Sequence, residues 1–339
     1  MSAATDTVAH HLDLGEPVHA LELLPGGGIV AGGTEGLVVV TDPSGRERLR
    51  LHLGDFLLAI ATSPDGTRLA AGGGERLAVW DLTVGTLVHE HASRWCSSLA
   101  WCAHSRHLAA GDGRRVRRFT RDGGPDWSSS PLASTVAGLA FLRRDGRRIV
   151  AAAYQGVTIL EPATDRVIEH LPAPGAIAGL AVAPNGRWVV GGSQDATLHG
   201  WKVPGGSDFR MSGFPTTVSR LAFEPGGRWM ACDADDTIAC WDFSGAGPTG
   251  REALLAEGHA AAVTALFWAP PDGATRVLVT ADAAGNVARW RIEPSHGPGD
   301  RLRPSWTAAT GDPAGAVAAT GTHVVSGHRS GAIWWHRSW

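Results

Sequence analysis

The 339-residue sequence predicts an all-β fold built from about eight repeated units of four short strands. Three observations support this prediction. A turn rich in Pro, Gly and Asp recurs every 39 to 46 residues, apolar–polar alternation flanks each copy, and the two chain ends supply complementary parts of one unit. Alternation with a period of two residues, in runs of four to seven, is typical of half-buried strands. No segment shows convincing helical periodicity.

The recurring turn is expected to join the first and second strands of each unit. Proline sets the backbone at one corner, and Asp-Gly or Asn-Gly suits the next. The 45 glycines and 20 prolines are dispersed along the chain, so they punctuate short elements and do not form a linker. The copies are residues 25–28 (PGGG), 64–67 (PDGT), 144–147 (RDGR), 184–187 (PNGR), 225–228 (PGGR) and 271–274 (PDGA), with a weaker copy at 103–106 (AHSR).

Apolar runs before and after each turn supply the strands. Residues 18–24 (VHALELL) and 218–223 (VSRLAF) are examples of the first strand. A second run follows the turn, and the third run ends in tryptophan in four units, where burial between sheets is expected. These tryptophans are Trp80, Trp201, Trp241 and Trp290, and the equivalent positions in other units hold Val40, Phe119 and Leu160.

The two chain ends are expected to complete the last unit together. That unit has three strands, at residues 315–320, 323–326 and 332–336, and lacks a fourth. Residues 9–15 (AHHLDLG) resemble residues 48–54 (RLRLHLG), which lie between two units. An N-terminal outer strand would close the ring and remove its exposed edges. The sequence therefore predicts a single closed β-propeller over residues 1–339, with eight four-stranded blades preferred and seven as the alternative.

A repeat of about forty residues in which Trp-Asp ends the third strand resembles the WD40 family, and the resemblance covers residues 12–339. The resemblance implies a buried network of His, Ser or Thr, Asp and Trp within a unit. His259, Thr280 and Trp290 match three members, with Ala284 where the Asp is expected. Two further units match only an Asp and the Trp, namely Asp195 with Trp201 and Asp235 with Trp241.

Composition and charge exclude several classes of protein. The net charge is −3 with both signs dispersed, so no basic footprint for nucleic acid is present. No apolar run has the length of a membrane span, and residues 1–8 lack the pattern of a signal peptide. Only Lys202 among 30 basic residues is lysine, which together with high Ala and Gly suggests a bacterial gene. We expect a monomeric cytoplasmic protein.

The four cysteines show no metal-binding spacing and are expected to be reduced and buried. Cys232 and Cys240 flank one hairpin, which leaves a disulfide between them as the alternative. The pair in His89-Glu-His91 has a spacing that metals use, but no third ligand is nearby, and residues 233–236 (DADD) supply too few oxygens for calcium. No cofactor, metal or catalytic residue is predicted.

The expected binding surface is the loop face, defined as the loops entering the first strands together with the turns between second and third strands. Aromatic and arginine side chains are the commonest binding hot spots. A wider set of loop residues includes Phe56, and the shortlist is Arg94, Trp95, Tyr154, Phe214, His328 and Arg329.

Two functions remain open at this point. The preferred one is a non-enzymatic scaffold that binds a protein or peptide on the loop face. The alternative is an enzyme or small-molecule binder with its site at the mouth of the axial channel, because propellers can build a site from many loops without a linear motif.

Overall fold

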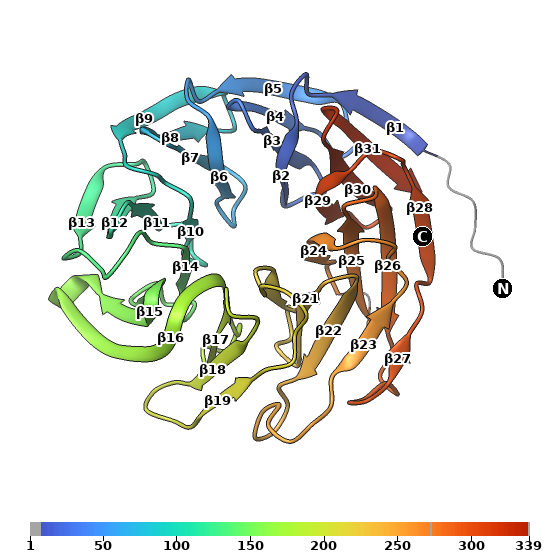
Figure 1. Ribbon diagram of the computed structural model, residues 1–339. Coiled ribbons are helices and arrows are strands. Elements are labelled where there is room, and N and C mark those ends of the chain that lie inside the picture. The colour runs from blue at the N-terminus through green and yellow to red at the C-terminus, as the bar shows by residue number, and fades with distance from the viewer. Residues whose placement is uncertain (1–7, 272, 338–339) are drawn as a thin grey trace.

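The computed structural model describes residues 8–271 and 273–337, which form a ring of antiparallel sheets around a common axis (Figure 1). Asp272 of the turn predicted at residues 271–274 lies outside the described residues, as do residues 1–7 and 338–339. The β-propeller prediction is confirmed. The one helical element described is a single 3-10 turn, Pro162–Thr164.

Six units have their own sheet. Unit 1 contains β2 (Val18–Leu23), β3 (Ile29–Gly33), β4 (Leu37–Thr41) and β5 (Glu47–His52). Unit 2 contains β6 (Leu57–Thr62), β7 (Arg68–Gly73), β8 (Arg76–Asp81) and β9 (Thr86–Ala92). Unit 3 contains β10 (Leu99–Trp101), β11 (His107–Asp112), β12 (Arg115–Thr120) and β13 (Pro125–Ser128). Unit 6 contains β20 (Leu221–Phe223), β21 (Trp229–Ala234), β22 (Thr237–Asp242) and β23 (Leu254–Glu257), with β27 (Arg301–Leu302) added in parallel to β23. Unit 7 contains β24 (Val263–Trp268), β25 (Arg276–Asp282), β26 (Asn286–Ile292) and β28 (Trp306–Ala309). Unit 8 contains β29 (Ala314–Ala319), β30 (His323–His328), β31 (Ala332–Arg337) and β1 (Val8–Asp13).

Units 4 and 5 share one six-stranded sheet. Its strands are β14 (Gly138–Phe141), β15 (Ile149–Glu161), β16 (Arg166–Val182), β17 (Trp188–Ser193), β18 (Leu198–Lys202) and β19 (Asp208–Met211).

Two long strands explain why these units merge. β15 reverses direction at Gln155 and Gly156, whose φ angles are both positive (68° and 130°). Its first part pairs with β14, and its second part pairs with the first part of β16. The second part of β16 pairs with β17 and forms the first strand of unit 5. The described residues therefore form seven hydrogen-bonded sheets, which hold the eight repeat units of the sequence.

The predicted joining of the chain ends is confirmed. β1 pairs antiparallel with β31, so that Leu12 lies opposite Ile333 and His10 opposite Trp335. Figure 1 shows blue β1 beside red β31 at the outer edge of the last sheet. The imidazole of His10 also reaches the carbonyl of Gly45 in unit 1, at 3.1 Å. The N-terminal strand thus ties unit 8 to unit 1.

The core lies between neighbouring sheets. Second and third strands are buried on both faces, and each apolar cluster combines side chains from adjacent units. Trp80, Trp201 and Trp290 are buried as predicted, whereas Trp241 is only partly buried. The positions predicted to be equivalent to these tryptophans, Val40, Phe119 and Leu160, are also buried.

The alternative of a disulfide in unit 6 is wrong. Cys232 lies opposite Ala239 and Cys240 lies opposite Ala231, so the two cysteines are one position out of register. Their side chains enter different apolar clusters on opposite faces of the sheet. All four cysteines are free and buried. Burial raises the pKa of the Cys96 and Cys240 thiols to about 12, so neither is a reactive thiolate.

Candidate functional site

Side chains from the entering loops hold the turns of the loop face in place. The Glu16 carboxylate accepts hydrogen bonds from the backbone N–H groups of Glu35 and Leu37, at 2.9 and 3.0 Å. Asp55 accepts in the same way from Glu75 and Arg76. These carboxylates satisfy donors that would otherwise be unpaired, and they fix each loop against the neighbouring turn.

Trp95 and Phe56 form an exposed aromatic pair on this face. Trp95 is 53% exposed and Phe56 is 44% exposed, and their rings meet edge to face with centroids 5.8 Å apart. Trp95 has a positive φ of 55°, and its N–H donates to the carbonyl of Gly74. This backbone turn buries Cys96 while the preceding indole points outward. A Cβ on Gly74 would lie 2.4 Å from the Phe56 ring, so glycine makes room for the pair.

Arg94 directly precedes Trp95 and adds an exposed positive charge to the same loop. Its backbone N–H donates to Asp112 Oδ1 at 2.7 Å, which anchors the loop. No hydrogen bond or ion pair joins its guanidinium group to another residue of the described ranges. Arg94, Asp112 and Arg114 line a surface cavity of about 620 Å³. We call Phe56, Arg94 and Trp95 the aromatic patch.

The other shortlisted residues are not brought to this patch. Tyr154 is 48% exposed and lines a separate cavity with His170 and Pro172, in the turn of β15. Phe214 is partly buried and lines a cavity with Trp241 and Leu255 between units 5 and 6. Arg329 is exposed on the turn that follows β30, in unit 8.

The prediction that His328 is a surface contact is wrong. His328 is fully buried: Nε2 lies 2.7 Å from Ser326 Oγ, and Nδ1 lies 2.9 Å from the Asp312 carbonyl. Ser326 Oγ also lies 2.8 Å from His336 Nε2. The sequence Gly-His-Arg at a strand end does not tell whether the histidine side chain faces solvent or the core. Here the imidazole of His328 is part of a buried hydrogen-bond network.

Unit 7 contains the complete network that the resemblance implies, with a different aspartate from the predicted position. His259 lies 3.1 Å from Asp282 Oδ2 through Nδ1 and 2.6 Å from Thr280 Oγ1 through Nε2. Trp290 Nε1 donates to the same hydroxyl at 2.8 Å. Asp282 ends β25, whereas Ala284 lies in the turn beyond it. The network therefore has its aspartate, two positions before the one that the resemblance implied.

The same shift of two positions applies in unit 6. Asp233, and not Asp235, is the buried aspartate, and it accepts hydrogen bonds from the backbone N–H groups of Ser219 and Arg220. In unit 5, Asp195 pairs with Arg210 at 2.9 Å in an exposed contact, so it takes no part in a buried network with Trp201.

No metal centre is seen in the described ranges, where no three His, Cys, Asp or Glu side chains converge as ligands. His89 and His91 stack with centroids 5.4 Å apart, and His91 Nε2 lies 2.7 Å from the Gly123 carbonyl. Within residues 8–271 and 273–337, no helix is long and apolar enough to span a membrane.

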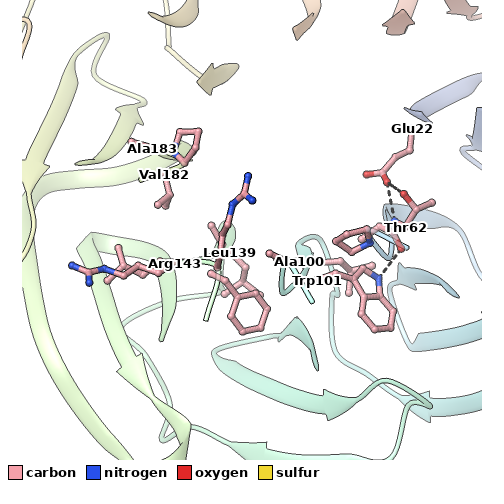
Figure 2. Close-up of a pocket in the computed structure, with 17 residues that line it drawn as sticks. Glu22, Thr62, Ala100, Trp101, Leu139, Arg143, Val182 and Ala183 are labelled. Carbon is pink, nitrogen blue, oxygen red and sulfur yellow. Dashed lines mark hydrogen bonds between the residues drawn. The ribbon is translucent and has the colours of Figure 1, made fainter. Parts of the chain in front are cut away.

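A cavity of about 380 Å³ opens at the axis among the first strands of units 1 to 5 (Figure 2). Apolar side chains form most of its wall, including Leu99, Leu139 and Val182. Its charged residues are Glu22, Arg143 and Arg144. The alternative function predicted a site at the axial channel, but no motif marked these residues, since they come from turns and strands far apart along the chain.

Acid is expected to destabilise the fold through its buried histidines. Burial lowers the pKa of both His259 and His328 below the usual value near 6.5. The folded state therefore binds fewer protons than the unfolded state, so stability is present above about pH 6.5 and is lost as pH falls below it.

Thermal unfolding at pH 7 and pH 5 measures this effect. We expect a lower midpoint at pH 5 and a smaller pH difference in His328→Gln. His104→Gln, at an exposed turn, should keep the wild-type difference. A midpoint that does not change with pH, or a His328→Gln variant with the full difference, would contradict the assignment.

The family model described as WD domain, G-beta repeat (WD40) matches residues 166–202 and 209–242. Nuclear distribution protein PAC1 of Coccidioides posadasii is 28% identical over 219 residues, which cover 62% of this chain and 41% of that protein. Nuclear distribution protein nudF 2 of Aspergillus clavatus is 34% identical over 95 residues, which cover 26% of this chain and 21% of that protein.

This chain thus spans less than half the length of either curated relative. Both relatives are fungal, so they give no support to the bacterial origin suggested by composition. The crystal structure of the computationally designed Ika8 protein superimposes with a TM-score of 0.76 at 20% identity, covering 96% of this chain and 98% of that one. This likeness concerns the fold.

Proposed function

Because this chain is a β-propeller with WD40 repeats, we propose that it is a non-enzymatic scaffold that binds a protein or peptide partner through the aromatic patch of its loop face. The observation that carries the proposal is the exposed pair of Phe56 and Trp95 beside the unpaired Arg94 guanidinium. A cytoplasmic location is part of the proposal, and the four free cysteines support it.

Exposure of the Phe56 and Trp95 rings to water is unfavourable in free energy when no partner is bound. An exposed Trp and Phe side by side leave a large apolar area in water, although most tryptophans of the chain are buried. Burying such rings against a partner releases that water, and Trp and Arg are the residue types that most often dominate binding energy. The loops that carry them are fixed by the Asp55 and Asp112 carboxylates, so little ordering is needed on binding.

The patch also limits the partner's chemistry. An apolar or aromatic side chain would pack on the two rings, and a carboxylate would pair with Arg94. A peptide that carries an apolar residue next to Asp or Glu therefore fits best. The relatives are named as nuclear distribution proteins, and their names carry no partner over to this chain.

An enzyme is the weaker alternative. The Ser and His side chains that do converge, Ser326 with His328 and His336, are fully buried and have no access to a substrate. Thr280 and His259 are buried in the same way. These groups stabilise the sheets.

Capture of partners from a lysate of the native host tests the scaffold proposal. The wild-type chain and the Trp95→Ala variant are immobilised, and the captured proteins are quantified by mass spectrometry. We expect at least tenfold less of the specific partner with Trp95→Ala, because a hot-spot truncation costs about 2 kcal/mol or more.

Tyr154→Ala is the matched control, since it removes an aromatic ring of similar exposure from another part of the same face. It should retain the partner. Loss with Tyr154→Ala and retention with Trp95→Ala would move the site away from the aromatic patch, and retention by both would reject it.

A further inference from the structure

The axial cavity has a carboxylate on one wall that no cation of residues 8–271 and 273–337 neutralises. Glu22, on β2, accepts hydrogen bonds from the N–H and the hydroxyl of Thr62 in unit 2, at 2.8 and 2.6 Å. Both bonds end on Oε2, and no described residue donates to Oε1. No Arg, Lys or His lies within ion-pair distance of this carboxylate among the residues that the structure describes. Burial raises the pKa of Glu22 despite the Thr62 bonds.

Glu22 is only partly exposed, and a partly desolvated carboxylate without a cation is costly, because its ionised form has lost hydration without gaining a counter-charge. Carboxylates with a perturbed pKa that line a cavity are concentrated at binding and catalytic sites. The free Oε1 borders the cavity, so a ligand's cationic donor can reach it.

The opposite wall carries the complementary charge. Arg143 and Arg144 lie on the turn between β14 and β15 and line the same cavity. Both are exposed, and neither guanidinium makes a hydrogen bond or ion pair with another residue of the described ranges. Figure 2 shows Glu22 and Arg143 on opposite sides of the cavity, with Leu139 and Ala100 between them.

The wall between these charges is apolar, and its polar groups already have partners. Leu99, Leu139 and Val182 supply apolar surface. Trp101 Nε1 donates to the Ala61 carbonyl at 3.0 Å, so this indole is not available to a ligand. A volume of about 380 Å³ is at the small end of the range for ligand pockets.

We propose that the axial cavity binds a small zwitterion with an apolar body, a short apolar peptide, with its ammonium group at Glu22 and its carboxylate at Arg143 and Arg144. The apolar side chains of the ligand pack on Leu139 and Val182. This site is separate from the aromatic patch, whose residues do not line the cavity. The ammonium group of the ligand is the counter-ion that Glu22 has no protein group to provide. The carboxylate of the ligand is likewise the counter-ion of the two arginines.

The dipeptide Leu-Leu is the probe, measured by calorimetric titration and by the shift of the unfolding midpoint. Two blocked forms separate the charges: N-acetyl-Leu-Leu has no ammonium group, and Leu-Leu amide has no terminal carboxylate. We expect Leu-Leu to bind and to raise the midpoint, and each blocked form to bind at least tenfold more weakly. Absence of binding at millimolar Leu-Leu, or equal binding of all three forms, would overturn the proposal.

Variants test each wall. Glu22→Gln should weaken Leu-Leu binding at least tenfold and abolish the preference over the acetylated form. The Arg143→Ala/Arg144→Ala double variant should abolish the preference over the amide. Glu35→Gln and Arg329→Ala, at exposed positions of the loop face, are matched controls and should bind normally.

The stability of the free protein separates binding from a structural role. If Glu22 serves only to accept the Thr62 bonds, Glu22→Gln lowers the unfolding midpoint and leaves the ranking of the three probes unchanged, which would overturn the proposal. If Glu22 serves the ligand, the midpoint of the free variant is unchanged or higher, because a desolvated carboxylate has been removed. Should Glu22→Gln not fold, Glu22→Asp retracts the charge by one methylene and should also weaken binding.

Discussion

Deletion of residues 1–13 is expected to lower the unfolding midpoint by about 10 °C and to make the protein associate. The deletion removes β1 and uncovers the outer edge of β31, where Ile333 and Trp335 are buried in the intact ring. Uncovering an apolar side chain of this size costs about 1.5–3 kcal/mol. It also removes the contact between His10 and Gly45 that ties unit 8 to unit 1.

Association follows from the same edge. An unpaired strand presents free N–H and C=O groups to other chains, and Trp335 would add apolar surface. Differential scanning calorimetry measures the midpoint, and light scattering on a sizing column measures mass against concentration. We expect a concentration-dependent increase in mass for the deletion.

Deletion of residues 1–7 alone is the control, because it leaves β1 (Val8–Asp13) in place. It should keep the wild-type midpoint and mass. A synthetic peptide of residues 8–15 should partly restore the midpoint of the longer deletion. Unchanged stability after removal of residues 1–13 would show that ring closure contributes little.

Thr280→Val is expected to cost about 2–5 kcal/mol of unfolding free energy, the second large effect. The Asp282 carboxylate at His259 Nδ1 places the imidazole proton on Nδ1, so Nε2 accepts from the Thr280 hydroxyl. That hydroxyl in turn accepts from Trp290 Nε1. Valine keeps the shape but leaves an indole donor and an imidazole acceptor without partners, at about 1–3 kcal/mol each.

Denaturant unfolding of Thr280→Val, Trp290→Phe and the double variant forms a cycle. We expect coupling between the two sites, because the Trp290 donor is already absent in Trp290→Phe. Thr158→Val, whose hydroxyl makes an exposed contact with His170, is the control and should change stability by about 0.5 kcal/mol or less. Additive effects at Thr280 and Trp290 would show that the network is not a unit.

Much of the fold could be predicted because local chemistry repeats. The Pro-Asp-Gly turns and the strand alternation recur at nearly constant spacing. A degenerate motif in one unit is therefore still recognised from its spacing to the other units. The positions of Trp80, Trp201 and Trp290 were predicted correctly for this reason. The merger of units 4 and 5 was not predicted. It depends on β16 continuing without a break through residues 172–175 (PAPG), a composition that is typical of turns.

The candidate site was only partly predictable. Trp95 was shortlisted from its position in a loop, and it is exposed. The Phe56 ring contacts Trp95 from a loop 39 residues earlier. A contact between residues so far apart along the chain could not be predicted from the sequence. His328 was predicted to be exposed in the turn between a second and a third strand, but it is the last residue of β30 and is buried, because its ring hydrogen-bonds to Ser326.

The sequence by itself determined the repeat, the all-β class and the closure of the ring through β1, because each follows from local patterns that the chain repeats. Only the tertiary structure decided which polar side chains lie together. Glu22, Thr62 and Arg143 come from three units and line one cavity only when the ring is closed. Asp282 and Asp233 take the place of the predicted positions 284 and 235, because hydrogen-bond geometry, which acts through space, selects an aspartate within the second strand over the position two residues later in the turn.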